Sequence, residues 1–321
     1  MKLLFLGQGK VLCEICSALL AKGHKIAGVI TYPKEDHDGD ILEHQCEMKY
    51  GLYKSVFEYC EKKEIKLLQA TNLDEQPILA WLKEIKIDLV ISIRSRLILR
   101  AAFVERFKNR IINLHIGMLP QYRGSGAMSW MIMNGEKKTS VTYHNVDVGI
   151  DSGDILRQIE LDIPSDAYPI DIYKLTSELF IATAPKLIED FYADRIKAMP
   201  QDKCRATYYP RLRTMIDGVI DFNMSPQEVE RFVRAFGWPY AGPFCKQGKK
   251  QIHFARTKVI PDGRLLHSYM NGLVISNGEE KGSVRVVCGQ GVLEVLSVRV
   301  ANEEVSAVDV IRVGRRLNGI H

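Results

Sequence analysis

Three polar side chains in the first half of the chain could carry out one reaction together. Asn113 and His115 stand two residues apart in an apolar run, and a carboxylate follows in the segment Asp151-Ser152-Gly153-Asp154. An amide can donate a hydrogen bond to a developing oxyanion, an imidazole can carry a proton, and a carboxylate can hold and charge that imidazole. These residue types are the minimum for acyl transfer to an amine, so the sequence predicts an enzyme.

The elements around these residues alternate between strands and helices. Short apolar runs predict strands at 2–6, 25–31, 66–69, 88–93 and 111–116. Periodic segments predict helices at 10–21, 53–63 and 77–85. This alternation predicts an α/β fold with a Rossmann-like, mostly parallel sheet. Ligands bind beyond the carboxyl ends of the strands in such sheets, and the fifth strand carries Asn113 and His115.

The rest of the chain predicts a second, smaller domain. A helix at 125–134, strands at 140–146 and 155–163 and a helix at 170–192 complete the first domain. A polar stretch with Pro200 and Pro210 follows and lacks periodicity. We therefore expect a catalytic domain at 1–195, a linker at 196–212 and a β-rich domain at 213–321. One helix at 225–236 and strands at 250–260, 272–276, 283–288 and 292–299 favour an OB-like β-barrel for the last part.

Composition narrows the class of protein. A net charge of +5 over 321 residues allows an anionic substrate but is small for a dedicated nucleic-acid binder. The first apolar run is too short for a signal peptide, and no run approaches the length of a membrane span. We expect a cytoplasmic protein without membrane contact. The seven cysteines do not suggest a disulfide framework, and Cys13 and Cys16 fit the packing of a helix better than a metal or redox pair.

Two further groups of residues have a functional and a structural interpretation. The Gly7-Gln8-Gly9-Lys10 turn lacks the third glycine of a dinucleotide-binding loop, because Leu12 stands in its place, and it predicts a tight turn near the active site. Lys10 could contact a substrate phosphate or point into solvent. His144 lies in an alternating run, where contact with the substrate is less favoured than a place in the core or at its rim.

The only clustered metal-ligand types do not have the spacing of a metal site. His37, Asp38, Asp40 and His44 lie in an acidic segment with a glycine, and a solvated loop explains them better. The sequence therefore predicts no metal.

Three motifs in order resemble those of the folate-dependent formyltransferases. These motifs are Asn113-Leu114-His115, then Leu119-Pro120-x-Tyr122-Arg123-Gly124, then Asp151-Ser152-Gly153-Asp154-Ile155. A weaker resemblance to the C-terminal domain of that superfamily covers Phe232-Val233-Arg234-Ala235 and Trp238-Pro239. The resemblance implies that Asn113, His115 and Asp151 are catalytic and that N10-formyltetrahydrofolate is the formyl donor.

The resemblance also implies roles for these residues. Asn113 and protonated His115 would donate hydrogen bonds to the developing oxyanion, and Asp151 would stabilise the imidazolium or take the amine proton. Neither a metal nor a covalent nucleophile is needed. The pterin of the donor would lie against loops 93–98 and 146–151, with the expected contacts Ile93, Arg94, Leu97, Ile98 and Asp147.

The acceptor is predicted from charge and from a further resemblance. Methionyl-tRNA formyltransferases of this family carry a basic insertion after the second strand, whereas residues 31–50 here hold two lysines and six acidic residues. Such a segment would repel an RNA backbone. The stretch 121–130 is similar to enzymes that formylate an amino sugar carried on a nucleoside diphosphate, so we expect a nucleotide-linked amino sugar as acceptor.

Under this hypothesis four side chains would bind the acceptor, or each could be purely structural. Lys10 and Arg123 would meet the diphosphate, and Tyr122 and Trp130 would pack on sugar or base. Methionyl-tRNA formylation is the alternative, with the second domain as an RNA platform, and a non-catalytic binding protein is a third class. The second domain could also supply a homodimer interface.

Overall fold

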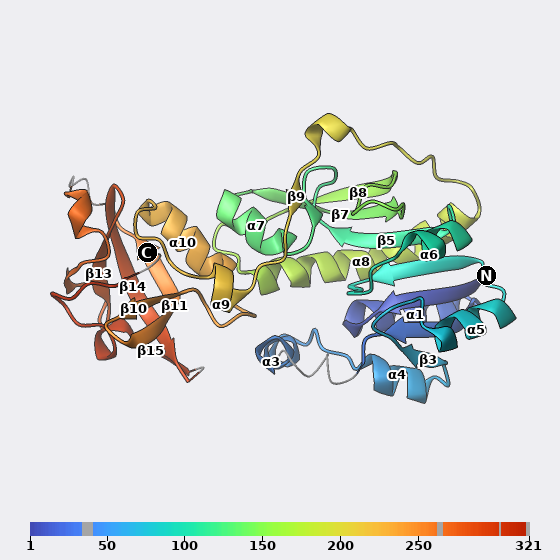
Figure 1. Ribbon diagram of the computed structural model, residues 1–321, viewed down its shortest axis with the longest axis horizontal. Helices are drawn as coiled ribbons and strands as arrows, with labels where there is room; N and C mark the ends of the chain where they lie inside the picture. Colours follow the sequence, from blue (N-terminus) through green and yellow to red (C-terminus); the bar gives the residue numbers. More distant parts are fainter. Residues whose placement is uncertain (34–40, 262–265, 302, 319–321) are drawn as a thin grey trace. The chain divides into compact units, whose positions relative to one another are not determined.

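The computed structural model describes residues 1–33, 41–261, 266–301 and 303–318, which form two compact units (Figure 1). The first unit comprises residues 1–127, 138–162 and 173–209, and the second comprises 128–137, 163–172 and 210–321. Two stretches inside the predicted catalytic segment therefore group with the second unit. The domain boundaries inferred from the sequence stay a prediction.

The first unit is built on a seven-stranded sheet in the order β3-β2-β1-β4-β5-β7-β8. Five strands are parallel, namely β1 (Lys2–Gly7), β2 (Lys25–Thr31), β3 (Leu67–Gln69), β4 (Leu89–Ile93) and β5 (Ile111–Ile116). The last two, β7 (Lys138–Asn145) and β8 (Ile155–Asp162), run antiparallel to their neighbours. The predicted Rossmann-like, mostly parallel sheet is confirmed.

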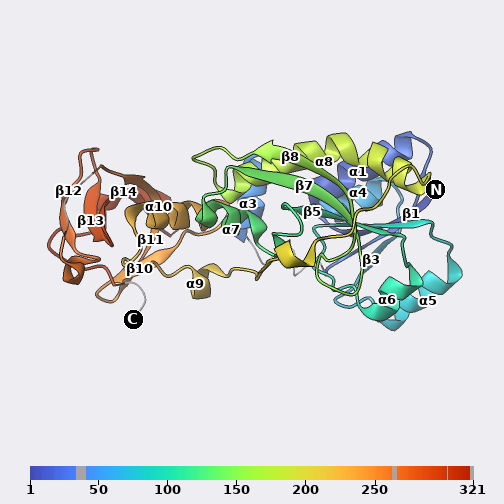
Figure 2. The same cartoon turned by 90° about the horizontal axis from the view of Figure 1, so that it is seen from above.

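Helices cover both faces of this sheet (Figure 2). One face packs against α1 (Gly9–Ala21), α4 (Val56–Lys62) and α8 (Pro169–Tyr192), and the other packs against α5 (Gln76–Glu84) and α6 (Ala101–Arg106). Leu3 and Phe5 contribute to the first core and Leu4 and Leu6 to the second, since successive side chains of a strand point to opposite faces. Both faces of the parallel strands are thus apolar, and a polar residue there stands out.

Smaller elements complete the unit. Helix α3 (Ile41–Lys49) lies between β2 and α4 in the sequence. The two-residue strands β6 (Arg123–Gly124) and β9 (Tyr208–Tyr209) form a parallel pair, and the short helix η1 (Lys203–Arg205) precedes β9. The segment expected to be a linker therefore contributes backbone pairing to the first unit.

The second unit holds a six-stranded antiparallel sheet. The strand order is β10-β11-β14-β13-β12, and β15 also pairs with β14. The strands are β10 (Phe244–Gln247), β11 (Lys250–Val259), β12 (Val274–Asn277), β13 (Val284–Cys288), β14 (Gly291–Val300) and β15 (Glu303–Ser306). Residues 315–318 hydrogen-bond to Lys246 on one outer strand and to Val274 on the other. This segment joins the two outer strands, as expected for a barrel-like sheet.

Helices accompany this sheet. They are α7 (Ala127–Asn134), α9 (Thr214–Asp217), α10 (Pro226–Ala235) and the short turns η2 (Ser268–Met270) and η3 (Ala307–Asp309). Helix α10 begins where the sequence predicts, because Ser225 accepts from the Glu228 N–H while the Glu228 carboxylate accepts from the Ser225 N–H. Val229 and Val233 of this helix join the core of the sheet. The predicted small β-rich domain is confirmed, although β10 and β15 were too short for their pattern to be recognised.

Candidate active site

Asn113 and His115 face the same side of the sheet because they alternate with apolar residues along β5. Ile112 and Leu114 point into the core beneath α1 and α8, which sends Asn113 and His115 to the opposite side. In β7 the apolar core residues are likewise Val141 and Tyr143. Strand alternation thus separates the polar residues of the site from the main core.

The register between β5 and β7 adds a second histidine. His144 lies directly opposite Asn113, and its Nε2 is 3.0 Å from Asn113 Nδ2. His144 Nδ1 donates to the Asn145 carbonyl at 2.7 Å, which fixes the orientation of the ring. From the sequence pattern, contact of His144 with the substrate is the less favoured interpretation. Its place beside Asn113 depends on a pairing register that the sequence does not reveal.

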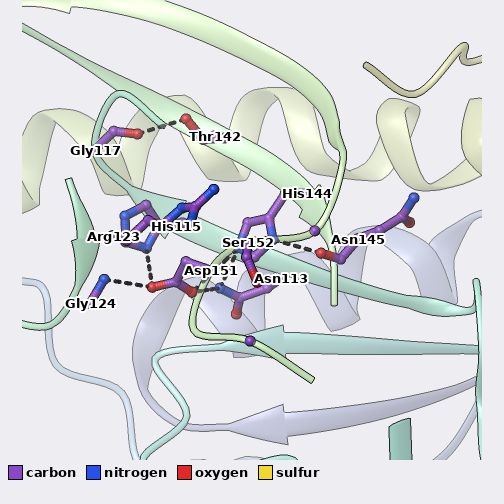
Figure 3. A network of polar contacts seen from close by, with 12 residues as sticks. Asn113, His115, Gly117, Arg123, Gly124, Thr142, His144, Asn145, Asp151 and Ser152 are labelled. Atoms are coloured by element: carbon purple, nitrogen blue, oxygen red, sulfur yellow. Dashed lines mark hydrogen bonds and ion pairs between the residues drawn. The ribbon is translucent and has the colours of Figure 1, made fainter. Parts of the chain in front are cut away.

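Asp151 reaches these residues from the loop that joins β7 to β8 (Figure 3). Its Oδ2 accepts from the Gly124 N–H at 2.9 Å and lies 3.6 Å from His115 Nδ1. Its Oδ1 lies 3.4 Å from Asn113 Nδ2 and 3.5 Å from His144 Nε2. The structure therefore brings together all three residues of the predicted trio.

The backbone of Asp151 adopts a conformation that few residues other than glycine adopt. Its φ is +46°, in the left-handed region, where a side chain other than glycine costs energy. Two residues later, a Cβ on Gly153 would lie 1.9 Å from the Asn145 carbonyl oxygen, so only glycine fits there. The loop thus turns sharply around the carboxylate.

His115 is buried and both its ring nitrogens face protein atoms. The Tyr122 carbonyl lies 2.6 Å from Nε2 and can only accept, so Nε2 carries the proton in the neutral ring and Nδ1 faces Asp151 with its lone pair. Burial lowers the pKa of His115 below its ordinary value, although the charge of Asp151 and the hydrogen bond with Tyr122 oppose this effect. Burial thus favours the neutral ring of His115, in which Nδ1 is the proton acceptor.

Asp151 is held ionised in the same surroundings. Burial raises the pKa of its carboxyl group, but the side chains of His144 and His115 and the Gly124 N–H together bring it down to about 2. An ionised carboxylate next to a neutral imidazole forms a pair that can accept a proton and then stabilise the resulting imidazolium. This is the charge arrangement needed to deprotonate an attacking amine.

The 199–209 segment forms a further side of the site that the sequence did not reveal. The Gln201 side chain donates to the carbonyls of Asp151 (2.8 Å) and Gly153 (2.7 Å). Its Oε1 accepts from Arg123 Nε (3.0 Å) and NH2 (2.7 Å). A lone glutamine in a polar stretch without periodicity carries no signal that would have identified it.

The predicted acceptor-binding residues occupy different surroundings. Arg123 is oriented by Gln201, and the buried Tyr122 ring stacks on Tyr209 with centroids 4.9 Å apart. Lys10 Nζ donates to the Gly51 carbonyl at 2.8 Å. Trp130 belongs to the second unit, where its indole N–H donates to the Pro210 carbonyl at 2.9 Å. Their roles in binding stay predictions.

The predicted donor-binding residues also divide into buried and exposed groups. Ile93 and Leu97 lie in the core, whereas Ile98 is 78% exposed. Arg94, at φ +50°, donates to Glu47 at 2.6 Å and to the Tyr173 hydroxyl at 2.8 Å. The exposed Asp147 accepts from the Ser152 hydroxyl and the Gly149 N–H, which shapes the loop that carries Asp151. A contact of Ile93 or Leu97 with a donor would therefore involve their backbone.

No group of three His, Cys, Asp or Glu side chains is arranged to hold a metal within the part of the chain that the structure describes. Of the cluster weighed from the sequence, His37, Asp38 and Asp40 lie outside the described residues. His44 packs edge-on against Tyr53, with ring centroids 4.2 Å apart. Among the helices of the described residues, none combines the length and the hydrophobicity of a membrane span.

Two family models match this chain. Residues 1–179 match the family described as formyl transferase. The chain belongs to the formyl transferase family. Residues 213–314 match the C-terminal domain of formyl transferases, so the family resemblance inferred from the motifs is confirmed. The 199–209 segment lies between the two matches.

Individual relatives cover nearly the whole chain. The methionyl-tRNA formyltransferase of Alkaliphilus oremlandii is 26% identical over 293 residues, which span 89% of this chain and 91% of that protein. The methionyl-tRNA formyltransferase of Acetivibrio thermocellus is 27% identical over 304 residues, or 93% and 92%. Each alignment extends over about nine tenths of both proteins.

Solved structures show the same fold. WlaRD, described as a sugar 3N-formyl transferase and solved with dTDP and 5-N-formyl-THF, has a TM-score of 0.66 at 20% identity, covering 94% of this chain and 98% of that one. An N-formyltransferase from Helicobacter canadensis, in complex with folinic acid and dTDP-3-aminofucose, has a TM-score of 0.67 at 20% identity, covering 92% and 98%. At these identities the likeness establishes the fold.

Proposed function

We propose that this member of the formyl transferase family transfers the formyl group of N10-formyltetrahydrofolate to the amine of a nucleotide-linked amino sugar. The observation that carries the proposal is the pair formed by ionised Asp151 and neutral His115, with Asn113 beside it. The amine nitrogen would bond to the formyl carbon and give its proton to this pair, and the bond from that carbon to N10 would then break as the proton passes to N10 of the departing tetrahydrofolate.

The donors and acceptors of each side chain indicate its role in the proposed reaction. His115 Nδ1 takes the amine proton, and the imidazolium is then stabilised by Asp151 Oδ2 at 3.6 Å and by the Tyr122 carbonyl at 2.6 Å. One N–H of the Asn113 amide makes only a long contact, 3.4 Å from Nδ2 to Asp151 Oδ1. This N–H is therefore available to the oxygen that gains charge. This division differs from the sequence-based expectation that protonated His115 donates to the oxyanion, because its Nε2–H already serves Tyr122.

The loops beside the trio fit a flat, largely apolar donor. Leu97 and Val146 pack against one apolar cluster, so the loops that follow β4 and β7 lie on the same side of the sheet. These loops expose Ile98, Val148 and Ile150, which are 78%, 70% and 59% exposed. Burial of such surface would contribute to binding a pterin. N10-formyltetrahydrofolate would supply the formyl group there.

Charge and orientation support a sugar nucleotide as acceptor. In the sequence, residues 31–50 carry six acidic side chains against two lysines, and even without Glu47, which pairs with Arg94, this excess disfavours a polyanionic acceptor. Gln201 occupies the Nε edge of the Arg123 guanidinium and fixes its plane, and a guanidinium so fixed is suited to a diphosphate. Two structures of similar fold were solved with dTDP or with a dTDP-linked amino sugar.

The test is a turnover assay with purified protein, N10-formyltetrahydrofolate and a panel of dTDP- and UDP-linked amino sugars. We expect release of tetrahydrofolate and a formylated sugar nucleotide, identified by mass spectrometry, with at least one member of the panel. Product formed only from methionyl-tRNA would refute the sugar acceptor, and no turnover with any amine would favour a binding protein.

Methionyl-tRNA formylation is the second candidate, and one feature of the second unit favours it. Exposed basic side chains gather on the β10–β11 hairpin and on the C-terminal segment that pairs with it through Lys246 and Asn318. The residues are Lys246, Lys249, Lys250, Arg312 and Arg315. If RNA binds there, formylation of methionyl-tRNA should weaken steeply with salt, whereas turnover of a sugar nucleotide should depend on salt much less.

A further inference from the structure

Gln201 connects two parts of the site that serve different purposes. Both amide hydrogens of its Nε2 are used, by the carbonyls of Asp151 and Gly153, and its Oε1 receives two N–H groups of Arg123. Carbonyls can only accept and a guanidinium can only donate, so the orientation of the Gln201 amide is fixed by its partners. One side chain thus satisfies four hydrogen bonds to two functional loops.

The loop that carries Asp151 needs such support. Asp151 has a φ of +46°, and a residue persists in this region only where its surroundings hold it there. The Gly124 N–H binds the Asp151 side chain, whereas Gln201 binds the backbone of Asp151 and of Gly153. The glutamine therefore restrains the turn from which the carboxylate projects.

The segment around Gln201 is itself fastened to the first unit on both sides. Met199 exchanges backbone hydrogen bonds with Ile155, and Thr207 binds Pro120 and Arg123 through its backbone. Further along, the Tyr209 ring stacks on Tyr122, whose carbonyl holds His115. These contacts make the segment a rigid base for Gln201.

We propose that Gln201 is a positioning residue that holds the Asp151 turn in its productive geometry and, through Oε1, fixes the plane of Arg123 for the acceptor. The inference rests on the proposed function and extends it to a residue outside both family matches. It predicts two separable effects, one on the chemical step through Asp151 and one on acceptor binding through Arg123.

Two substitutions separate these effects. Gln201→Leu removes all four hydrogen bonds, so kcat should fall about tenfold or more and KM for the acceptor should rise about threefold to tenfold. Gln201→Glu keeps an acceptor for Arg123 but cannot donate to the two carbonyls, so kcat should fall while KM for the acceptor stays close to the wild-type value. A general loss of folded protein would not produce this split.

Gln247 offers a matched control in the second unit. Its side chain also bridges a distant backbone, accepting from the Arg312 N–H at 3.2 Å and donating to the Arg312 carbonyl at 3.4 Å. Gln247→Leu should leave kcat and KM for a sugar nucleotide unchanged. Thermal unfolding of all variants shows whether they fold.

A titration independent of turnover completes the test. The charged and titratable groups around His115 are Asp151 at 3.6 Å and His144, whose ring centroid is 6.1 Å away. If Gln201→Leu lets Asp151 move, the His115 pKa followed by NMR should fall further, with the resonance assigned by its loss in His115→Gln. An unchanged His115 titration and unchanged kcat in Gln201→Leu would overturn the inference. A shifted titration without turnover of any sugar nucleotide would uphold it and refute the proposed function.

Discussion

The two sides of the candidate active site are held in different ways. Asn113, His115 and His144 project from neighbouring strands, where the hydrogen-bond ladder of β5 and β7 sets their spacing. Asp151 projects from a loop with a left-handed backbone, held by the Gly124 N–H and by Gln201. The position of the carboxylate next to the imidazole therefore depends on contacts from residues that lie far apart in the sequence.

This difference predicts different effects of substitution on the two sides of the site. A strand residue is fixed by backbone bonds that survive most side-chain substitutions, so changing it removes a functional group and little else. A loop residue depends on individual contacts, so its function can be lost through substitutions elsewhere. Substitutions on the strand side should abolish turnover with the fold intact, and substitutions around the loop should weaken it in graded steps.

The largest effect is expected on the strand side. Replacing His115 with alanine removes the proposed proton acceptor, so kcat should fall by about a thousandfold or more. The measurement is steady-state turnover with the proposed sugar-nucleotide acceptor, together with circular dichroism. A variant that keeps a tenth of wild-type kcat would show that His115 is not the base.

A smaller effect is expected around the loop from Gly124→Ala. Gly124 has a φ of +98°, and a Cβ there would lie 2.3 Å from the Tyr209 carbonyl oxygen, so the N–H that serves Asp151 must shift. Loss of a hydrogen bond to a charged group should reduce kcat/KM about tenfold to a hundredfold. Gly23→Ala, at a φ of +83° where a Cβ meets no atom within 4 Å, serves as a control for the strain of alanine at positive φ.

The pH dependence tests which form of His115 is active. Because burial lowers its pKa, the neutral base predominates above a pKa that lies below the ordinary histidine value. We expect kcat/KM to rise about tenfold per pH unit in acid and to level off before neutrality, since one proton must leave His115. Activity that falls as the pH rises through this range would instead indicate a protonated oxyanion donor.

Stability should respond to acid in two steps with the same sign. His115 has a lowered pKa, so the folded protein loses stability as the pH falls below the ordinary histidine value, where the unfolded chain binds the proton first. The pKa of Asp151 is lowered to about 2, so its contribution is present above the ordinary carboxyl value and is lost between there and about pH 2. Denaturant unfolding at several pH values, compared between wild type and Asp151→Asn, measures the second step.

The smallest effect is expected in the second unit. Ser225→Ala removes one half of the capping box of α10 and should cost about 1 kcal/mol of stability. Turnover of a sugar nucleotide should not change, because Ser225 takes no part in the contacts of the trio. A drop in kcat with this variant would contradict the expectation that turnover depends on the first unit and that the α10 cap affects only stability.

Several features could be predicted from the sequence because they depend on local pattern. The alternation of Ile112 and Leu114 with Asn113 and His115 shows which side chains leave the core. The succession of apolar runs and helices gives the parallel sheet, and Ser225-Pro226 marks the start of α10. The three ordered motifs give the family.

Other features could not be predicted, since they depend on which segments meet. The sequence does not show that β7 pairs with β5 in the register that sets His144 opposite Asn113. Nor does it show that the polar 199–209 segment returns to the first unit. Glu47 is one of the six acidic residues that the sequence sets against an RNA backbone, yet it is buried against Arg94.

The sequence by itself determined the candidate catalytic groups and the sheet that presents them, because residue type and strand periodicity are local properties. Only the tertiary structure decided how these groups are charged and held. The lowered pKa of His115 comes from burial, and the ionised state of Asp151 comes from partners on β5, β6 and β7. Gln201 shows the same principle, since a glutamine acquires its role only where a folded chain brings two carbonyls and a guanidinium to its two ends.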